Sequence, residues 1–299
     1  MKLRHHGIKL CSSFRVRLQG RLRIGLLAAC SSIAVVPITS VTAQQLAPRP
    51  SSDTAPSHTD VLNRRDAITA AAFVLGTAAI MPLDRRIAVE SQRPSLQDNA
   101  PLHHAMTGFR LLGEPGSIIV AGATYVYGRT QNSPRSAEIG LRTMESIGAA
   151  GLTTLVIKGF TGRARPFVTG DTNPRDYKAG RGFHDDNYSS FPSGHVTTAF
   201  AAASAASQEI SYLWPHASHL WTPVLFTSAS LVGVARIYED KHWASDVIAG
   251  AAVGTLVSRV IVRYQRAHPR NAIDRLLLPA GVFQMNGGRA TSFAWNYRW

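Results

Sequence analysis

Three short clusters of this 299-residue sequence contain the side chains that a phosphoryl-transfer reaction needs. In chain order they hold Lys158 and Arg165, then Ser193, Gly194 and His195, and finally Arg236, His242 and Asp246. A transferred phosphoryl group carries charge on its oxygen atoms, which lysine binds as a point charge and arginine with a planar fork. Histidine can supply both a nucleophile and a general acid. The clusters therefore predict a phosphate-binding site that works through side chains.

The second cluster has the pattern of a helix start. Ser193 follows Pro192 and is suited to an N-cap position. Gly194 has no Cβ, so the backbone there can approach a bound anion closely. His195 then lies at the positive end of the helix, where backbone N–H groups favour negative ligands.

The third cluster pairs a histidine with a carboxylate. His242 and Asp246 are four residues apart, so they share a face if the stretch is helical. The carboxylate could hold one ring nitrogen and leave the other free to attack phosphorus. Taken singly, such a pair is more often a local hydrogen bond, and Lys158 and Arg165 alone would most often be a solvated helix end. The coincidence of three matched clusters favours the catalytic interpretation.

The segments around the clusters have helical patterns. Apolar residues recur at helical spacing from Ser133-Pro134 to Lys158, and further helices are expected over residues 67–82, 195–210, 220–235 and 246–262. The polar stretch 167–191 is expected to be a functional or mobile loop. Asn286-Gly287 separates two short runs and favours a C-terminal β-hairpin. The expected fold class is an all-α helical bundle with that short hairpin.

In this order, the clusters resemble the three signatures of the type 2 phosphatidic acid phosphatase (PAP2) superfamily, which also contains class A acid phosphatases and vanadium haloperoxidases. The signatures are a Lys, six residues and Arg-Pro; a Pro-Ser-Gly-His; and a Ser-Arg, five residues, His, three residues and Asp. The matching segments are Lys158 to Pro166, Pro192 to His195, and Arg236 to Asp246. The resemblance covers roughly residues 100–265 and implies the PAP2-type bundle.

The resemblance implies a metal-independent phosphatase mechanism in two steps, with no cofactor. His242 would attack phosphorus and form a phosphohistidine, Asp246 would orient it, and His195 would protonate the leaving oxygen and then activate water. The phosphoryl oxygens would be held by Lys158, Arg165, Ser193, Gly194 and Arg236.

A few positions depart from the family pattern. Ala235 replaces the serine that precedes the third arginine, which removes one hydroxyl contact to phosphate. Glu239 and Asp240 put negative charge near the nucleophile and could disfavour highly charged substrates. Arg163 and Lys178 are nearby cations that match no family position.

Residues 1–43 have the pattern of a secretory signal peptide. They carry basic residues without an acid, then an apolar run from Ile24 to Val36 and small residues at Val41-Thr42-Ala43. An uncleaved anchor helix and a lipoprotein signal ending at Cys30 are the alternatives. Both cysteines, Cys11 and Cys30, lie in this segment, so a mature chain would have no thiol.

The rest of the chain divides by composition. Residues 44–65 are expected to be a flexible linker, 66–270 the phosphatase-like domain, and 271–299 a tail with the hairpin. The net charge of +14 includes no run of like charge that indicates nucleic-acid binding. Most apolar segments are shorter than the ~20 residues of a membrane span, which favours a soluble or peripheral domain.

These patterns predict an exported phosphatase, in the periplasm or on the periplasmic side of the inner membrane. Its substrate would be a phosphate ester or a lipid (di)phosphate, and a membrane surface is a further expected partner. The sequence does not define the oligomeric state. Two other functions fit the same residues: a haloperoxidase that holds vanadate on His242, and a non-catalytic envelope protein. Vanadate-dependent halide oxidation would favour the former, and phosphate-ester turnover would exclude the latter.

Overall fold

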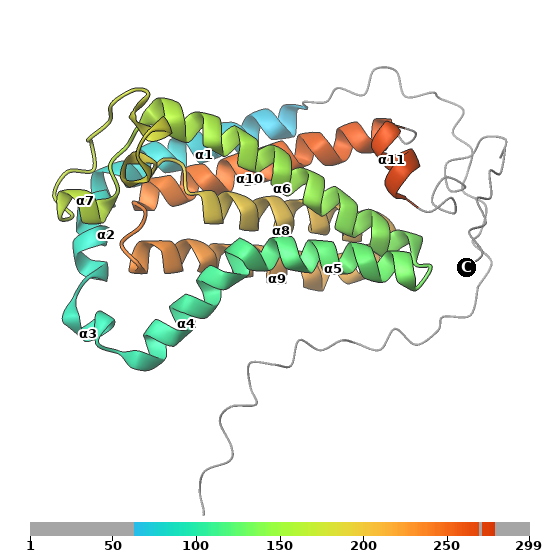
Figure 1. Ribbon diagram of the computed structural model, residues 1–299, viewed down its shortest axis with the longest axis horizontal. Coiled ribbons are helices and arrows are strands. Elements are labelled where there is room, and N and C mark those ends of the chain that lie inside the picture. Colours follow the sequence, from blue (N-terminus) through green and yellow to red (C-terminus); the bar gives the residue numbers. More distant parts are fainter. Residues whose placement is uncertain (1–62, 269–270, 279–299) are drawn as a thin grey trace, which may run out of the picture. The chain divides into compact units, whose positions relative to one another are not determined.

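The described part of the chain consists of helices and connecting loops. The computed structural model describes residues 63–268 and 271–278. The α-helices are α1 (Arg64–Ile80), α2 (Asp84–Ser91), α3 (Pro94–Gln97), α4 (Ala100–Leu111), α5 (Ser117–Thr130), α6 (Pro134–Thr161), α7 (Pro166–Thr169), α8 (Gly194–Leu213), α9 (Pro215–Tyr238), α10 (Ala244–Ala267) and α11 (Ala272–Leu277) (Figure 1). Short 3-10 or π turns lie at Met81–Leu83, Leu112–Gly116, Arg181–Phe183 and Asp186–Tyr188.

The all-α class is confirmed for the residues that the structure describes, which contain no strand beyond an isolated bridge between Arg163 and Tyr177. The predicted signal segment, most of the predicted linker and the predicted C-terminal hairpin lie outside those residues. The short helix α11 lies in the predicted tail and had no counterpart among the expected elements.

The four helices predicted around the clusters are confirmed as α6, α8, α9 and α10, each somewhat longer than expected. The end of α6 is fixed by Gly162, which has a left-handed φ of 55°. A Cβ at this position would lie 1.9 Å from the carbonyl oxygen of Lys178. Only glycine fits there, so the helix ends one turn after Lys158 and the chain enters the polar loop.

Two details of the predicted helix starts differ. α1 begins at Arg64, because Asn63 caps it by accepting a hydrogen bond from the backbone N–H of Asp66, so the helix includes the last two residues of the predicted linker. Ser133 and Ser193 occupy the expected N-cap positions, but neither side chain makes a capping hydrogen bond.

α8 lies among the other long helices and packs against α5, α6, α9 and α10. Its buried side chains are mostly small, such as Ala199 and Ala203. Gly254 of α10 lies so close to α8 that a Cβ would be 2.4 Å from the carbonyl oxygen of Thr197. Small residues let helix backbones approach closely, as they do in membrane bundles.

Polar contacts hold α1 against one end of α10 and α2 against the other end. Asp66 near the start of α1 pairs with Arg263 at 2.5 Å, and Asp84 at the start of α2 accepts a hydrogen bond from the backbone N–H of Ser245 at 2.8 Å. Along α10, the separation of Ser245 and Arg263 corresponds to about 27 Å at 1.5 Å per residue. This length is close to the ~30 Å thickness of a bilayer hydrocarbon core.

Within residues 63–268 and 271–278, three segments are long and apolar enough to cross a membrane: Arg64–Ser91, α9 and α10. Outward-facing side chains of α1 are apolar, with Val74 and Leu75 exposed by 68% and 69%. The expectation of a soluble or peripheral domain underestimated helix length, because α9 and α10 each have 24 residues. The polar residues that interrupt α10, such as Thr255 and Ser258, are buried inside the bundle.

Candidate active site

The predicted site residues lie where four helix ends meet, at the end of the bundle beside α2 and α7 (Figure 1). Lys158 is in the last turn of α6 and Arg236 in the last turn of α9. His195 is in the first turn of α8, and Asp246 is in the first turn of α10. Neighbouring helices that run in opposite directions thus bring distant parts of the sequence together.

Hydrogen bonds tie the three clusters to one another. The backbone N–H of Ser193 donates to the carbonyl of Asp246 at 3.0 Å, which joins the second cluster to the third. The indole Nε1–H of Trp243 donates to the carbonyl of Ala164 at 2.9 Å, which joins the third cluster to the first. These bonds involve buried groups, so the relative positions of the clusters are well defined.

His242 has a defined tautomer. Its Nδ1 lies 2.8 Å from the backbone carbonyl oxygen of Ser190. A carbonyl only accepts hydrogen bonds, so Nδ1 carries the proton and Nε2 keeps its lone pair. Burial, together with the nearby cations Lys158 and Arg236, lowers the pKa of His242 to about 3, and Asp246 only partly opposes this shift. His242 is therefore neutral at pH 7, the form that can act as a nucleophile.

Asp246 does not bind the ring of His242 directly, in contrast to the expectation from their spacing. Its Oδ2 lies 3.8 Å from Nδ1 of His242 and instead accepts hydrogen bonds from Ser190 Oγ at 2.5 Å and the backbone N–H of Trp243 at 2.9 Å. The reason is that His242 precedes Trp243, the N-cap of α10, so the pair is not on a helical turn. Asp246 thus influences His242 through its charge, and through Ser190, which is hydrogen-bonded to both residues.

Arg163 holds Asp246 in place. Its Nη1 donates to Asp246 Oδ1 at 2.5 Å, and its Nη2 donates to Asp84 Oδ2 at 2.8 Å. All three side chains are buried. Asp84 also accepts from both the backbone N–H and the hydroxyl of Ser245. The sequence did not predict a role for Asp84 or Ser190, and it left Arg163 unassigned. Of the three, only Arg163 could have been suspected, because it lies two residues before Arg165 inside the first cluster.

Lys158 is a buried cation whose charge is weakened. Its Nζ donates to the backbone carbonyl of Ser189 at 2.5 Å. Burial, together with the positive charge of Arg165, lowers the pKa of Lys158 to about 8. The ammonium group is thus charged at pH 7 and becomes neutral as the pH rises through about 8.

Each of the two predicted arginines is paired with a carboxylate. Arg165 donates from Nη2 to Asp186 Oδ1 at 2.7 Å, in the polar loop. Arg236 pairs through Nη1 with Glu239, whose other oxygen pairs with Arg110 at 3.0 Å. Glu239 therefore pairs with Arg236 and Arg110 and not with His242.

Two buried polar atoms of the predicted phosphate-binding set have no hydrogen-bond partner within residues 63–268 and 271–278: Ser193 Oγ and Arg236 Nε. Leaving such groups unpaired is costly unless a ligand or water binds them. At Gly194, an added Cβ would meet only the Lys158 side chain, at 3.6 Å. A hydroxyl, a guanidinium N–H and an ammonium group thus surround a helix start, which is the chemistry that binds an oxyanion.

His195 lies beside an acid that the sequence did not single out. Its Nδ1 is 3.5 Å from Glu114 Oε2. Burial and the charge of Arg236 lower the pKa of His195 to about 4, and Glu114 opposes them. A bound dianion would raise this pKa, because it favours the charged imidazolium. Nowhere in the described residues, this site included, could a group of three or more His, Cys, Asp or Glu side chains hold a metal ion.

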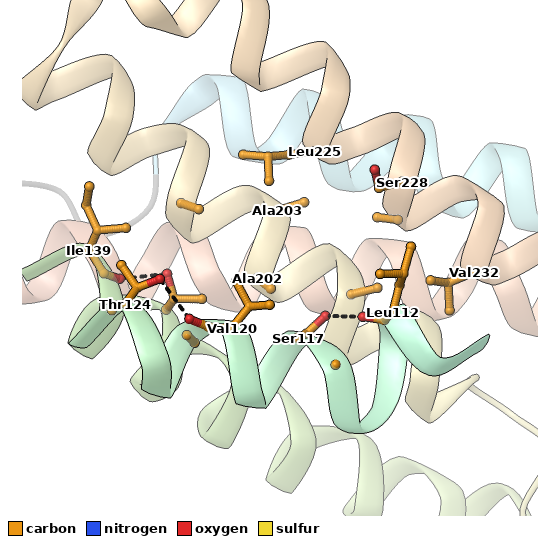
Figure 2. Close-up of a pocket in the computed structure, with 17 residues that line it drawn as sticks. Leu112, Ser117, Val120, Thr124, Ile139, Ala202, Ala203, Leu225, Ser228 and Val232 are labelled. Carbon is orange, nitrogen blue, oxygen red and sulfur yellow. Dashed lines mark hydrogen bonds between the residues drawn. The ribbon is translucent and has the colours of Figure 1, made fainter. Parts of the chain in front are cut away.

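An apolar pocket of about 190 Å³ adjoins this end of α8 and α9. Ala199 and Val232, which help to line it, are each one helical turn from His195 and Arg236. Figure 2 shows that the pocket lies between α5, α6, α8 and α9, with Leu112 at one side. The hydroxyls in its wall donate to backbone carbonyls of their own segments: Ser117, Thr124, Thr143 and Ser228. The wall therefore offers mainly hydrocarbon to a ligand.

A family model described as the PAP2 superfamily matches residues 140–270. The lipid A 1-phosphatase of Porphyromonas gingivalis is 46% identical over 72 residues, which are 24% of this chain and 15% of that protein. The chain thus aligns with only a small part of this curated relative.

The fold is similar to the crystal structure of a transmembrane PAP2-type phosphatidylglycerolphosphate phosphatase from Bacillus subtilis. The TM-score is 0.51 at 22% sequence identity, and the match covers 70% of this chain and 99% of the other. At this identity the similarity concerns the fold alone.

The charge of Lys158 predicts how anion binding depends on pH. Inorganic phosphate should stabilise the protein against thermal unfolding at pH 7.5, and the inferred affinity should fall at least about tenfold by pH 9.5. The reason is that Lys158 loses its proton above pH 8, and a hydrogen bond to a charged group contributes roughly 1.5–3 kcal/mol.

The measurement is the unfolding temperature over a phosphate titration at each pH. Lys158→Met should bind phosphate weakly at both pH values. Lys178→Met removes an exposed cation of the polar loop and should behave like the wild type. Equal affinities at pH 7.5 and 9.5 in the wild type would contradict the assignment.

Proposed function

We propose that the chain is a membrane-embedded phosphatase of the PAP2 superfamily, whose family model matches residues 140–270, and that it hydrolyses lipid phosphates through a phosphohistidine on His242. The observation that carries this proposal is the neutral His242, with its proton fixed on Nδ1 by the Ser190 carbonyl and its Nε2 free. Such a ring can attack phosphorus without first losing a proton.

In the first step, the phosphoryl oxygens bind to the three cations and to Ser193 and Gly194. Nε2 of His242 attacks phosphorus, and an N–P bond forms as the P–O bond to the leaving group breaks. The bound dianion raises the pKa of His195, which thereby takes up a proton and donates it to the leaving oxygen. The imidazolium character that develops on His242 is stabilised by the nearby charge of Asp246.

In the second step, His195 accepts a proton from a water molecule that attacks phosphorus. The N–P bond breaks, the pair of electrons returns to Nε2 of His242, and inorganic phosphate is released. The side chains supply the nucleophile, the acid and base, and the positive charge, so the proposed reaction requires no metal.

Two observations support a lipid substrate over a soluble phosphate ester. The apolar pocket begins one turn from His195 and Arg236, where an acyl chain attached to the bound phosphate could lie (Figure 2). Large apolar side chains are exposed on α1, α5, α6 and α9, and three of the described segments are long enough to cross a bilayer. A membrane-embedded site receives its substrate directly from the lipid phase.

We further propose that the site faces the periplasm. Because Asp66 and Asp84 mark opposite ends of the span Arg64–Ser91, Asn63 and the site lie on opposite sides of the membrane. Residues 1–65 contain ten Lys and Arg against two Asp, which supports a cytoplasmic location for Asn63. This topology and a signal peptide cleaved after Ala43 exclude each other, because a cleaved signal that exports residue 44 would place the site inside.

The catalytic proposal predicts the behaviour of two histidine variants. The full chain, purified in detergent with EDTA, should release phosphate from phosphatidic acid and from p-nitrophenyl phosphate. His242→Ala should lose activity by more than about 10³-fold because the nucleophile is gone. His195→Ala should lose about 10²–10⁴-fold on the lipid. His184→Ala, an exposed residue of the polar loop, is the matched control and should remain active.

Retained activity in His242→Ala, or its loss in EDTA, would contradict the mechanism. If no ester released phosphate but halide oxidation appeared on addition of vanadate, the haloperoxidase function would replace the proposal.

The orientation predicts which engineered cysteines are accessible in intact cells. In a background with Cys11→Ser and Cys30→Ser, a membrane-impermeant maleimide should label Lys178→Cys in the polar loop without lysis. It should label Gln131→Cys, between α5 and α6 at the far end, only after lysis. Labelling in the reverse order would place the site in the cytoplasm, and labelling of both in intact cells would refute a membrane-spanning bundle.

A further inference from the structure

Glu114 lies beside the candidate general acid, although no signature of the sequence includes it. Its Oε2 is 3.5 Å from Nδ1 of His195, and its Oε1 accepts a hydrogen bond from Thr198 Oγ1 at 2.6 Å. We propose that Glu114 is a positioning residue for His195: it directs the Nδ1–H toward its carboxylate, turns Nε2 toward the leaving oxygen and stabilises the proton that His195 donates.

The backbone is shaped to put Glu114 in this place. Between α4 and α5 the helical path is interrupted, and Glu114 has an extended conformation with φ −133° and ψ 127°. The neighbouring Gly113 packs directly on the start of α8, where a Cβ would lie 3.2 Å from the carbonyl oxygen of His195 and 2.7 Å from a methyl of Val232. A larger residue at position 113 would push the segment away. The close packing thus holds the carboxylate against the first turn of α8.

The charges that face His195 explain why an acid is useful there. Arg236 from α9, Arg110 from α4 and Lys158 from α6 all disfavour the protonated ring, and burial acts in the same direction. Glu114 favours the protonated ring. Without this carboxylate, His195 would have less tendency to take up the proton that it must pass to the leaving group.

This inference rests on the proposed function, and it predicts a dependence on the leaving group. An alkoxide must be protonated as it leaves, whereas p-nitrophenolate is stable enough to leave without a proton. Loss of the Glu114 charge should therefore slow the release of an alcohol much more than the release of p-nitrophenol. General acid catalysis contributes about 10²–10⁴-fold, which sets the scale of the effect.

The experiment compares Glu114→Gln with the wild type in kcat/KM, which reports the first chemical step, for n-octyl phosphate and p-nitrophenyl phosphate. Gln keeps the shape and the acceptor for Thr198 but removes the charge. We expect a loss of about 10²-fold or more for octyl phosphate and less than about tenfold for p-nitrophenyl phosphate. The alkaline limb of the octyl phosphate profile should also shift to lower pH, because the pKa of His195 falls when the negative charge is removed.

Two further variants make the result specific. Glu90→Gln removes an acid that forms an exposed ion pair with Arg93. It should leave kcat/KM unchanged for both substrates. Thr198→Val removes only the hydrogen bond to Oε1, and it should give the same substrate pattern with a smaller loss; it also tests the inference if Glu114→Gln fails to fold. Equal losses on both substrates with an unshifted pH profile would overturn the inference while leaving the proposed function intact. A wild type that hydrolysed neither ester would instead refute the proposed function, and this inference with it.

Discussion

The candidate site depends on the buried pairing of Arg163 with two carboxylates from distant parts of the chain. The guanidinium reaches Asp84 at the start of α2 and Asp246 at the start of α10. Removing one partner of such a buried pair costs about 3–5 kcal/mol, because a charge is left uncompensated. The pairing therefore locks the first cluster, the α10 N-terminus and the Arg64–Ser91 segment into one arrangement. Ser190 is held by Asp246 through its hydroxyl, and it in turn holds His242 through its carbonyl.

This arrangement reconciles two requirements that oppose each other. A phosphate site needs several cations to bind the anion. A nucleophilic histidine also needs a hydrogen-bond acceptor to orient its ring, and cations cannot supply one. Here the neutral carbonyl of Ser190 orients the ring of His242. Asp246 forms an ion pair with Arg163, and its Oδ2 stays 3.8 Å from Nδ1 of His242. The nucleophile thus remains neutral and correctly turned in the same place where an anion binds. At the acid, the cations are opposed by Glu114, so the two histidines have different electrostatic surroundings.

The sequence predicted the four long helices and the residues of the three clusters, because helical periodicity and short motifs are local properties. It could not predict Asp84, which lies far from Arg163 along the chain and has no motif around it. The role of Ser190 depends on a backbone carbonyl, which a sequence does not reveal. The direct bond expected between His242 and Asp246 was wrong because the helix starts after His242. Glu114 was missed because its position depends on an interruption between α4 and α5 and on close packing at Gly113.

The central claim is that Nε2 of His242 receives the phosphoryl group. The most direct measurement is to quench His195→Ala during turnover of p-nitrophenyl phosphate, a substrate that needs little acid assistance, so that the phosphoenzyme accumulates when the base for the second step is absent. The phosphopeptide is then isolated at alkaline pH, where phosphohistidine is stable, and its phosphorylated atom is identified by NMR. The account predicts phosphate on Nε2 of His242 and none in His242→Ala. Phosphate on Nδ1 of His242, or on any other residue, would contradict it.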